Sequence, residues 1–209
     1  MTLLKPLGEE TWGGATWPLG AHIDPADGAT TFAVAAPRAT RVSLEFFPAA
    51  RGADAELSVP MALGEDGVWR AKVHGARHGT LYGFRVWGSN WPHVAGWEPG
   101  SVAGFVADRD DELNHFNPNK VLFDPYAREV THNPMGVGAQ RAWFGSGPVD
   151  VDGRPGRMVD TARIAPKAVV IEDDTSFGSY PKHPEEDNAI YEAHVKNLTL
   201  HPSAAKLGD

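Results

Sequence analysis

The side chains with the clearest chemical potential in this sequence are four tryptophans that follow one another closely. They are Trp69, Trp87, Trp91 and Trp97. A flat aromatic face buries a large area and stacks well on sugar rings, so these four are the candidate carbohydrate-binding residues. The alternative for each of them is packing in a hydrophobic core. For Trp69, which stands in the alternating run VWRAKV, core packing is the favoured interpretation.

A cluster of acidic residues could hold a cation. In the stretch ADRDDELN, Asp108, Asp110 and Glu112 alternate as the oxygen ligands of a cation do. An EF-hand loop, however, requires glycine at its sixth position, where Leu113 stands. A solvated acidic loop is therefore expected, and no metal site is assigned.

Two short acidic runs, EDD at 172–174 and EED at 185–187, offer adjacent carboxylates. General acid–base catalysis needs groups placed within reach of one substrate atom, which adjacent side chains on a polar loop rarely achieve. Surface charge is therefore the favoured interpretation of both runs. The nine histidines are scattered without the HExxH spacing of a zinc site. No catalytic residue is assigned and no cofactor is expected.

The charge balance and the cysteine content exclude several classes. The formal net charge is -8, and no Lys/Arg-rich run concentrates the 19 basic residues, so neither nucleic acid nor an anionic membrane is an expected partner. With no cysteine, disulfides and thiolate chemistry are absent. The first residues lack the apolar run of a secretory signal, so a cytoplasmic location is expected.

Five short runs with strand character lie between residues 30 and 88. They are TTFAVAA, RVSLEFF, AELSVPM, GVWRAKV and TLYGFRVWG, and the spacers between them supply Gly, Pro and Asp for turns. In RVSLEFF, Val42, Leu44 and Phe46 share one face, while Ser43 and Glu45 take the other. This alternation predicts an antiparallel, immunoglobulin-like β-sandwich in which one face of the sheet is buried and the other meets solvent.

The rest of the chain has a different character. Residues 89–166 are dense in Gly, Pro, Asn and Asp, which predicts a long irregular segment that needs a neighbour to pack on. KAVVI at 167–171 is a short run of the buried type. Residues 188–199 again alternate like a strand.

Three blocks in this second half resemble a known family. NHFNPNKVLFDPYAREVTHNP at 114–134, TARIAPKAVVIEDD at 161–174 and NAIYEAHVKNLTLHP at 188–202 are similar, in the same order, to segments of the isoamylase and glycogen-debranching branch of glycoside hydrolase family 13. The five strand runs resemble, more loosely, the carbohydrate-binding-module-48-like sandwich that precedes the catalytic barrel in that family.

The resemblance implies a division into three parts. Residues 1–100 would form the β-sandwich, 101–186 a loop-rich linker, and 187–209 the start of a (β/α)8 barrel, of which only the first strand is present. The implied activity is hydrolysis of α-1,6 branches in glycogen or starch by a retaining mechanism. The catalytic Asp, Glu and Asp of the family lie on later barrel strands, so no residue of this chain inherits a catalytic role.

The resemblance also bears on ligands. Some members of the family bind calcium with help from the acidic loop before FNPNK, but no ligand is assigned among Asp108, Asp110 and Asp111. The tryptophan-bearing turn with which some modules of this type hold glycogen is replaced by FFPAARGADAE. Packing on the barrel is therefore the favoured role of the sandwich, with α-glucan as the partner of the full-length enzyme. The alternatives are a stand-alone glucan-binding module and a regulatory interaction domain that docks a partner through its loop-rich face at 89–166.

Overall fold

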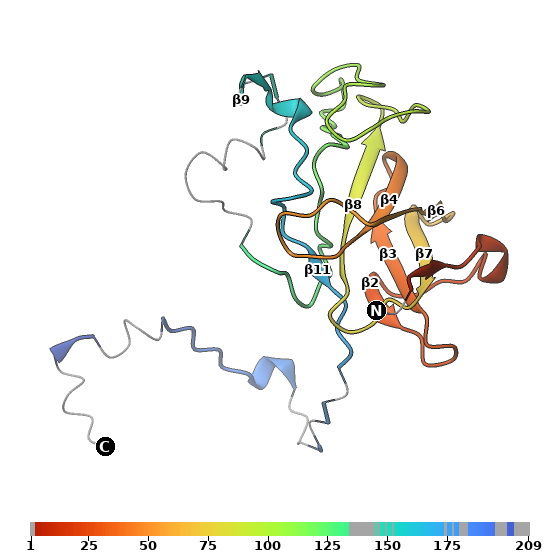
Figure 1. Ribbon diagram of the computed structural model, residues 1–209. Coiled ribbons are helices and arrows are strands. Elements are labelled where there is room, and N and C mark those ends of the chain that lie inside the picture. The colour runs from red at the N-terminus through yellow and green to blue at the C-terminus, as the bar shows by residue number, and fades with distance from the viewer. Residues whose placement is uncertain are drawn as a thin grey trace. The chain divides into compact units, whose positions relative to one another are not determined.

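The computed structural model describes residues 3–133, 145, 147–148, 150–151, 153–173, 175–176, 178–179, 184–194 and 200–202. The chain forms two units, Met1–Asp173 and Asp174–Asp209. The first unit contains two antiparallel sheets (Figure 1). Among the described residues, no helix is long and apolar enough to cross a membrane.

The first sheet has the strand order β1-β7-β3-β2, and β6 also pairs with β7. Its strands are β1 (Lys5–Pro6), β2 (Gly20–Ile23), β3 (Thr30–Ala35), β6 (Ala62–Leu63) and β7 (Val68–His74). The second sheet has the order β11-β8-β4-β5. Its strands are β4 (Ala39–Phe47), β5 (Leu57–Pro60), β8 (Leu81–Gly88) and β11 (Ala168–Val169).

The remaining elements are short. Strands β9 (Asp150–Val151) and β10 (Arg154–Pro155) form a hairpin. Single turns of 3-10 helix occur at η1 (Glu9–Thr11), η2 (Gly156–Met158) and η3 (Glu185–Asp187).

The core lies between the two sheets. Phe32 of β3 makes edge-to-face contacts with Phe46 of β4 and Tyr82 of β8, with ring centroids 5.4 and 5.0 Å apart. All three side chains are fully buried. The five predicted runs correspond to β3, β4, β5, β7 and β8, so the predicted β-sandwich is confirmed.

The outer face of the second sheet differs from the prediction. Val42, Leu44 and Phe46 point into the core as expected, but Ser43 and Glu45 on the opposite face are only 3% and 6% exposed. The prediction that this face meets solvent is therefore wrong. The alternation of residues predicts which side chains share a face of the sheet. It does not predict whether distant parts of the chain pack on that face and bury it.

Segments from the loop-rich half of the chain cover this outer face. Phe47 at the end of β4 packs with Val121, Ala162 and Ala165 in a second small hydrophobic cluster. Gly83 of β8 makes the close approach possible, because a Cβ at that position would lie 2.9 Å from a methyl carbon of Val121. In Figure 1 the segment around residues 156–167 runs down beside β8 to β11.

The residues of the FNPNK block hold these covering segments together. Asn119 is fully buried and accepts a 2.7 Å hydrogen bond from the backbone N–H of Gly100. Its side-chain amide donates to the carbonyls of Ser101 and Arg157. Asn117 donates to the same Arg157 carbonyl at 3.1 Å. The block therefore ties two separate stretches of irregular backbone, at 100–101 and at Arg157, to one point, which satisfies polar groups that would otherwise lack partners.

Two buried lysines hold the backbone between residues 156 and 165 through hydrogen bonds. The Nζ of Lys120 donates to the carbonyls of Gly156 and Val159 at 2.8 Å each. The Nζ of Lys167, from the APK block, donates to two carbonyls between residues 162 and 165 and lies 4.5 Å from the centroid of the Phe47 ring. Burial lowers the pKa of each lysine to about 8, because it penalises the charged ammonium.

The compact unit is therefore larger than a sandwich of residues 1–100, since it extends to Asp173 and includes most of the expected linker. KAVVI supplies β11, which pairs with β8. In the second unit, residues 188–194 have no regular secondary structure, and Ile190 and Tyr191 are 93% and 84% exposed. Residues 195–199 lie outside the described residues, so the first barrel strand stays a prediction.

We expect Asn119→Ala to destabilise the first unit by about 2–4 kcal/mol, because the N–H of Gly100 and the carbonyl of Ser101 lose their partner, and the carbonyl of Arg157 keeps only Asn117. Urea unfolding monitored by tryptophan fluorescence measures this change. Asn188→Ala, at an exposed position of the second unit, is the matched control and should change the free energy of unfolding by less than about 0.5 kcal/mol. Equal effects of the two substitutions would contradict the structural role of Asn119.

Candidate functional site

A cleft of about 630 Å³ lies over the outer face of the second sheet, which we call the outer cleft. Strand β4 contributes Arg41, Ser43 and Glu45 to it, and β8 contributes Arg85 and Trp87. These side chains share one face because positions two apart along a strand point the same way. The walls come from irregular segments and include Asp54, Glu56, His93, Trp97, Pro99 and Asp160.

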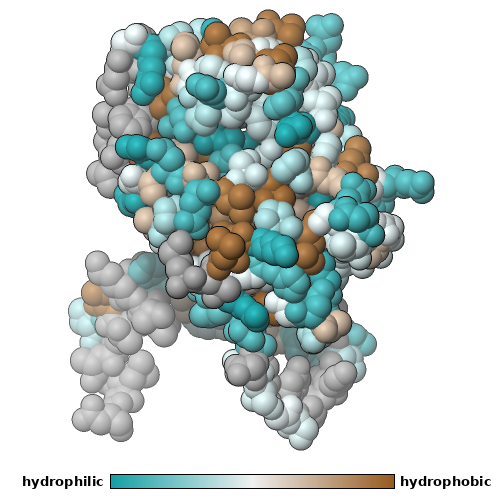
Figure 2. All heavy atoms as spheres, turned by 45° about the vertical axis from the view of Figure 1, so that its right-hand side comes forward, coloured by the Kyte–Doolittle hydropathy of each residue, from teal (hydrophilic) through white to brown (hydrophobic). Residues whose placement is uncertain are grey.

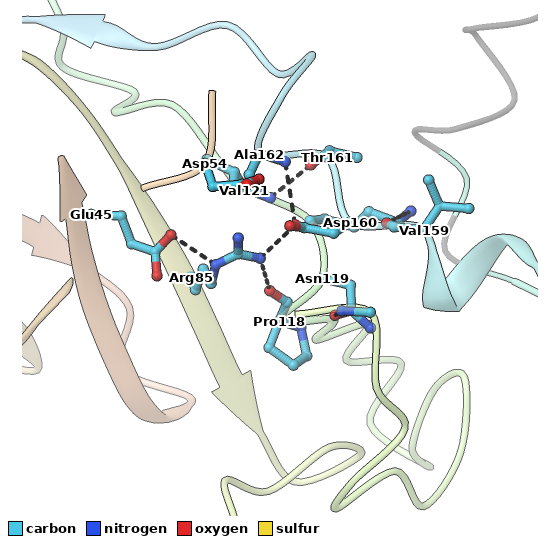
Figure 3. Close-up of polar contacts among 12 residues, drawn as sticks. Glu45, Asp54, Arg85, Pro118, Asn119, Val121, Val159, Asp160, Thr161 and Ala162 are labelled. Atoms are coloured by element: carbon cyan, nitrogen blue, oxygen red, sulfur yellow. Dashed lines mark hydrogen bonds and ion pairs between the residues drawn. The ribbon is translucent and has the colours of Figure 1, made fainter. Parts of the chain in front are cut away.

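The floor of the outer cleft is organised by Arg85, which is only 1% exposed. Its guanidinium donates to Glu45 on the neighbouring strand β4 and to Asp160 in the segment around residues 156–167, which covers the outer face of the sheet, each at 2.8 Å. It also donates to the carbonyl of Pro118 at 2.8 Å. Figure 3 shows the guanidinium held between Glu45 on one side and Asp160 and Pro118 on the other.

Burial and charge pairing act in opposite directions on this group. Burial raises the pKa of Glu45, although the positive charge of Arg85 and its hydrogen bond partly oppose that rise. Burial would lower the pKa of Arg85, but the carboxylates of Glu45 and Asp160 outweigh it and raise that pKa. An ion pair this deeply buried is stable only while its partners remain in place.

The aromatic end of the outer cleft is built from Trp87 and Trp97. Their ring centroids are 5.1 Å apart and nearly perpendicular, and His93 makes a second edge contact with Trp87 at 5.2 Å. Desolvation lowers the pKa of His93, with a smaller contribution from the charge of Arg41. The imidazole is therefore biased towards its neutral form at neutral pH.

Three N–H donors at this end of the outer cleft have no hydrogen-bond partner among the described residues. They are Nε1 of Trp87, Nε1 of Trp97 and Nε of Arg41. A buried donor without a partner is costly, and such groups normally mark water or a ligand with acceptor oxygens. The arrangement can therefore accept a molecule that has an apolar face and several hydroxyl oxygens.

The four sequence-predicted tryptophans separate into two pairs. Trp87 and Trp97 line the outer cleft. Trp69 belongs to the main core, where its indole donates to the carbonyl of Ala36 at 2.9 Å, and Trp91 is 1% exposed and donates to the carbonyl of Ala103. Core packing is the interpretation favoured for Trp69 by its sequence context, whereas Trp91 is buried against the loop that contains Ala103 and Phe105. The carbohydrate role of all four stays a prediction, and the geometry favours Trp87 and Trp97.

The acidic loop has a structural role in the described residues. Asp108 accepts two hydrogen bonds from the guanidinium of Arg157, at 2.8 and 2.6 Å. Asp110 accepts from the hydroxyl of Ser89 and from Asn114, and these hydrogen bonds lower its pKa to about 2. No group of three or more potential metal-ligating side chains occurs within the part of the chain that the structure describes.

Sequence reasoning missed the polar floor of the outer cleft. Glu45 was assigned to a solvent-exposed face, and Arg85 and Asp160 carried no motif. The one available signal was that a charged residue stands at the outward position of both central strands, Glu45 in β4 and Arg85 in β8, although the register needed to pair them came only from the structure.

We expect Arg85→Met to destabilise the protein by about 3–5 kcal/mol at pH 7, because it leaves Glu45 buried without its positive partner. The loss should shrink as the pH falls towards 4.5. The folded-state pKa of Glu45 is raised and rises further without Arg85, so between pH 4.5 and that value the folded state binds more protons than the unfolded one, and stability falls as the pH rises.

Urea unfolding of wild type and variant at pH 4.5, 6 and 7.5 measures this dependence. The double variant Glu45→Gln/Arg85→Met is the control, since it removes the titrating carboxyl and should show a flatter difference. A deficit that does not depend on pH in the single variant would contradict the assignment.

Comparison with known proteins agrees with this architecture. The sequence profile of carbohydrate-binding module 48 (isoamylase N-terminal domain) matches residues 18–127, just over half of the chain. An isoamylase of Pseudomonas amyloderamosa is 37% identical over 189 residues, covering 87% of this chain. A glycogen debranching enzyme of Salmonella typhi is 35% identical over 200 residues, covering 94% of this chain.

The chain spans about a quarter of the length of these relatives, 24% and 25% respectively. Among solved structures, a product complex of the multi-modular glycogen-degrading pneumococcal virulence factor SpuA aligns with 95% of this chain and 17% of that chain, with 18% identity and a TM-score of 0.47. The profile match, together with the sandwich that carries it, shows that this chain belongs to the carbohydrate-binding module 48 (isoamylase N-terminal domain) family.

Proposed function

We propose that this chain serves as the N-terminal, non-catalytic module of an α-1,6-glucan debranching glycoside hydrolase that acts on glycogen or starch in the cytoplasm. The observation that carries the proposal is the 37% identity to an isoamylase over 87% of this chain. That alignment reaches far past the matched sandwich. It therefore takes in the segments that cover the outer face as well.

The state of the carboxylates supports a non-catalytic role. A retaining glycosidase needs two carboxyl groups about 5–5.5 Å apart, one of which is free to attack the sugar. In the outer cleft, Glu45 and Asp160 are both held by Arg85, and Asp54 is paired with Arg163 at 2.6 Å. These acids stabilise the fold instead of facing a substrate as a free pair.

The outer cleft supports a role in guiding glucan. Trp97 offers partly exposed aromatic surface beside Trp87, which is itself 3% exposed. The three buried donors without partners among the described residues would gain an acceptor if a sugar hydroxyl reached them. A volume of about 630 Å³ is within the usual range for small-molecule sites. Binding there would hold a chain segment close to the module.

A second surface supports a role in packing on a catalytic barrel. A groove of about 510 Å³ is lined mainly by apolar side chains, among them Phe84, Val86 and Phe116. At its rim Leu122 and Phe123 are 49% and 40% exposed. Exposed apolar groups gathered beside a groove are typical of a protein interaction surface. On the face that Figure 2 shows, apolar residues lie in small groups among polar ones.

The alternative function is a stand-alone glucan-binding or regulatory interaction module. The observation in its favour is that the residues lining the outer cleft all lie between 41 and 160, within the first unit, so the described residues of the second unit contribute nothing to it. Sedimentation equilibrium bears on the choice, because a mass that rises with protein concentration would favour the interaction module.

We expect no release of reducing ends when the purified chain is incubated with glycogen, because three of the four acidic side chains that line the outer cleft are held in ion pairs. A reducing-sugar assay over several hours measures this, with heat-denatured chain as the control. Release above that control would overturn the non-catalytic assignment.

We expect Trp97→Ala to weaken glucan binding about tenfold, since truncation of an aromatic anchor removes its whole contact area. Affinity electrophoresis in gels that contain glycogen measures the retardation of wild type and variant. Tyr191→Ala, which removes an aromatic side chain that is 84% exposed, is the control and should migrate like wild type. Equal retardation of Trp97→Ala and wild type would remove the outer cleft from the proposal.

A further inference from the structure

A second cleft, remote from the outer cleft in its residues, lies at the first sheet. It has a volume of about 450 Å³ and is formed by the N-terminal stretch 9–16 and the turn between β6 and β7. We call it the N-terminal cleft. Its lining includes Glu9, Trp12, Gly64, Glu65, Asp66 and Arg70.

Trp12 is positioned by its backbone and by a second tryptophan. It follows the helical turn η1, and its indole donates to the carbonyl of Leu7 at 3.3 Å. The backbone N–H of Leu7 in turn donates to the backbone carbonyl of Lys72 on β7. Trp17 meets Trp12 at 5.2 Å and 61°, and its own indole is anchored on the carbonyl of Phe32 in β3. Trp12 is only partly buried and lines the N-terminal cleft, so part of its aromatic surface is available.

The opposite wall is a bidentate ion pair. Arg70 donates to the two carboxylate oxygens of Asp66 at 2.9 and 2.6 Å. The hydrogen bonds from Arg70, helped by the backbone N–H of Val68 and by the charge of Arg70, lower the pKa of Asp66 to about 2, so this carboxylate stays ionised. Gly64 makes the arrangement possible, because a Cβ there would lie 2.6 Å from Arg70 and 2.7 Å from Asp66.

One donor of this pair is left over. Arg70 is 6% exposed, and its Nε has no hydrogen-bond partner among the described residues. This cleft therefore combines an aromatic surface, a buried donor that lacks an acceptor, and carboxylates that can only accept. A buried donor without a partner is uncommon in folded proteins and normally marks a bound water or a ligand.

These groups define the chemistry of an occupant. With Arg70 neutralised by Asp66, the carboxylates of Glu9 and Glu65 leave the N-terminal cleft negative, which disfavours an anion. A cation would suit the carboxylates and the indole but could not accept from the arginine. A hydroxyl group both donates and accepts, and a sugar ring presents several of them around an apolar face.

We propose that the N-terminal cleft is a second carbohydrate-binding site, which takes a neutral oligosaccharide with Trp12 as the stacking surface and the Asp66–Arg70 pair as the partner of its hydroxyl groups. The choice of α-1,4-linked glucan among neutral sugars rests on the proposed function. The volume of about 450 Å³ lies within the usual range for small-molecule sites, so this site would hold a chain end or a short segment.

The direct test is an NMR titration of the unmutated chain with maltohexaose, observed at the indole N–H resonances. Trp12 is assigned by the peak that Trp12→Phe removes. We expect the Trp12 resonance to shift with a saturable dependence on sugar, and to do so equally in Trp97→Ala, in which the outer cleft is altered. A Trp12 resonance that does not move at about 20 mM maltohexaose would overturn the proposal.

Calorimetry in the Trp97→Ala background separates this site from the outer cleft. We expect Trp12→Ala to weaken the remaining maltohexaose binding at least about tenfold and Trp12→Phe to weaken it less. Unchanged affinity in Trp12→Ala would overturn the proposal and leave the proposed function intact.

Tetramethylammonium tests the cationic alternative, and a shift of the Trp12 resonance with that ion but not with maltohexaose would also overturn the proposal. Cellohexaose tests the linkage, and equal binding of both hexasaccharides would support a neutral-sugar site while removing the α-glucan choice.

Discussion

The guanidinium of Arg85 lies on the outer face of a sheet that is covered on both sides. Its need for partners determines which other parts of the first unit must pack against this face. A charge with 1% exposure must be matched inside the protein. Its partners come from β4, from the covering segment at Asp160 and from the backbone at Pro118. The irregular half of the chain is therefore a structural part of the sandwich, because it supplies what the central strand cannot provide for itself.

The same principle extends to the rest of the cover. Irregular backbone can be buried only if its polar groups find partners, and here the partners are amide and ammonium side chains. Asn119, Lys120 and Lys167 each reach two or more backbone carbonyls or N–H groups. A cover held in this way keeps a fixed shape without helices or long strands. That fixed shape gives the outer cleft its walls.

Much of the sandwich could be predicted from sequence, because β3, β4, β5, β7 and β8 alternate apolar residues with a period of two over enough positions to be recognised. The covering of the outer face could not be predicted. It depends on pairings between residues far apart in the chain, such as Arg85 with Asp160, and on a small residue at Gly83 that shows its purpose only beside Val121.

The candidate sites were predictable to a similar degree. Tryptophan chemistry pointed to Trp87 and Trp97, but the same reasoning included Trp91, because composition cannot distinguish an indole that lines a cleft from one that fills a core. Trp12 was not singled out at all. It lies in a polar stretch without strand alternation. The pairing of β6 with β7 positions Asp66 and Arg70, and the pairing of β1 with β7 brings the N-terminal stretch to the same sheet.

The dependence of Lys120 on the carbonyls of Gly156 and Val159 has a consequence for where this module can be divided. The family match ends at residue 127, whereas the oxygens that receive this ammonium lie about thirty positions further on. The region matched by the family, residues 18–127, is thus smaller than the compact unit Met1–Asp173. Grafting this module onto another enzyme would call for a junction after Asp173, where the compact unit ends, since a cut soon after residue 127 would remove the oxygen partners of Lys120.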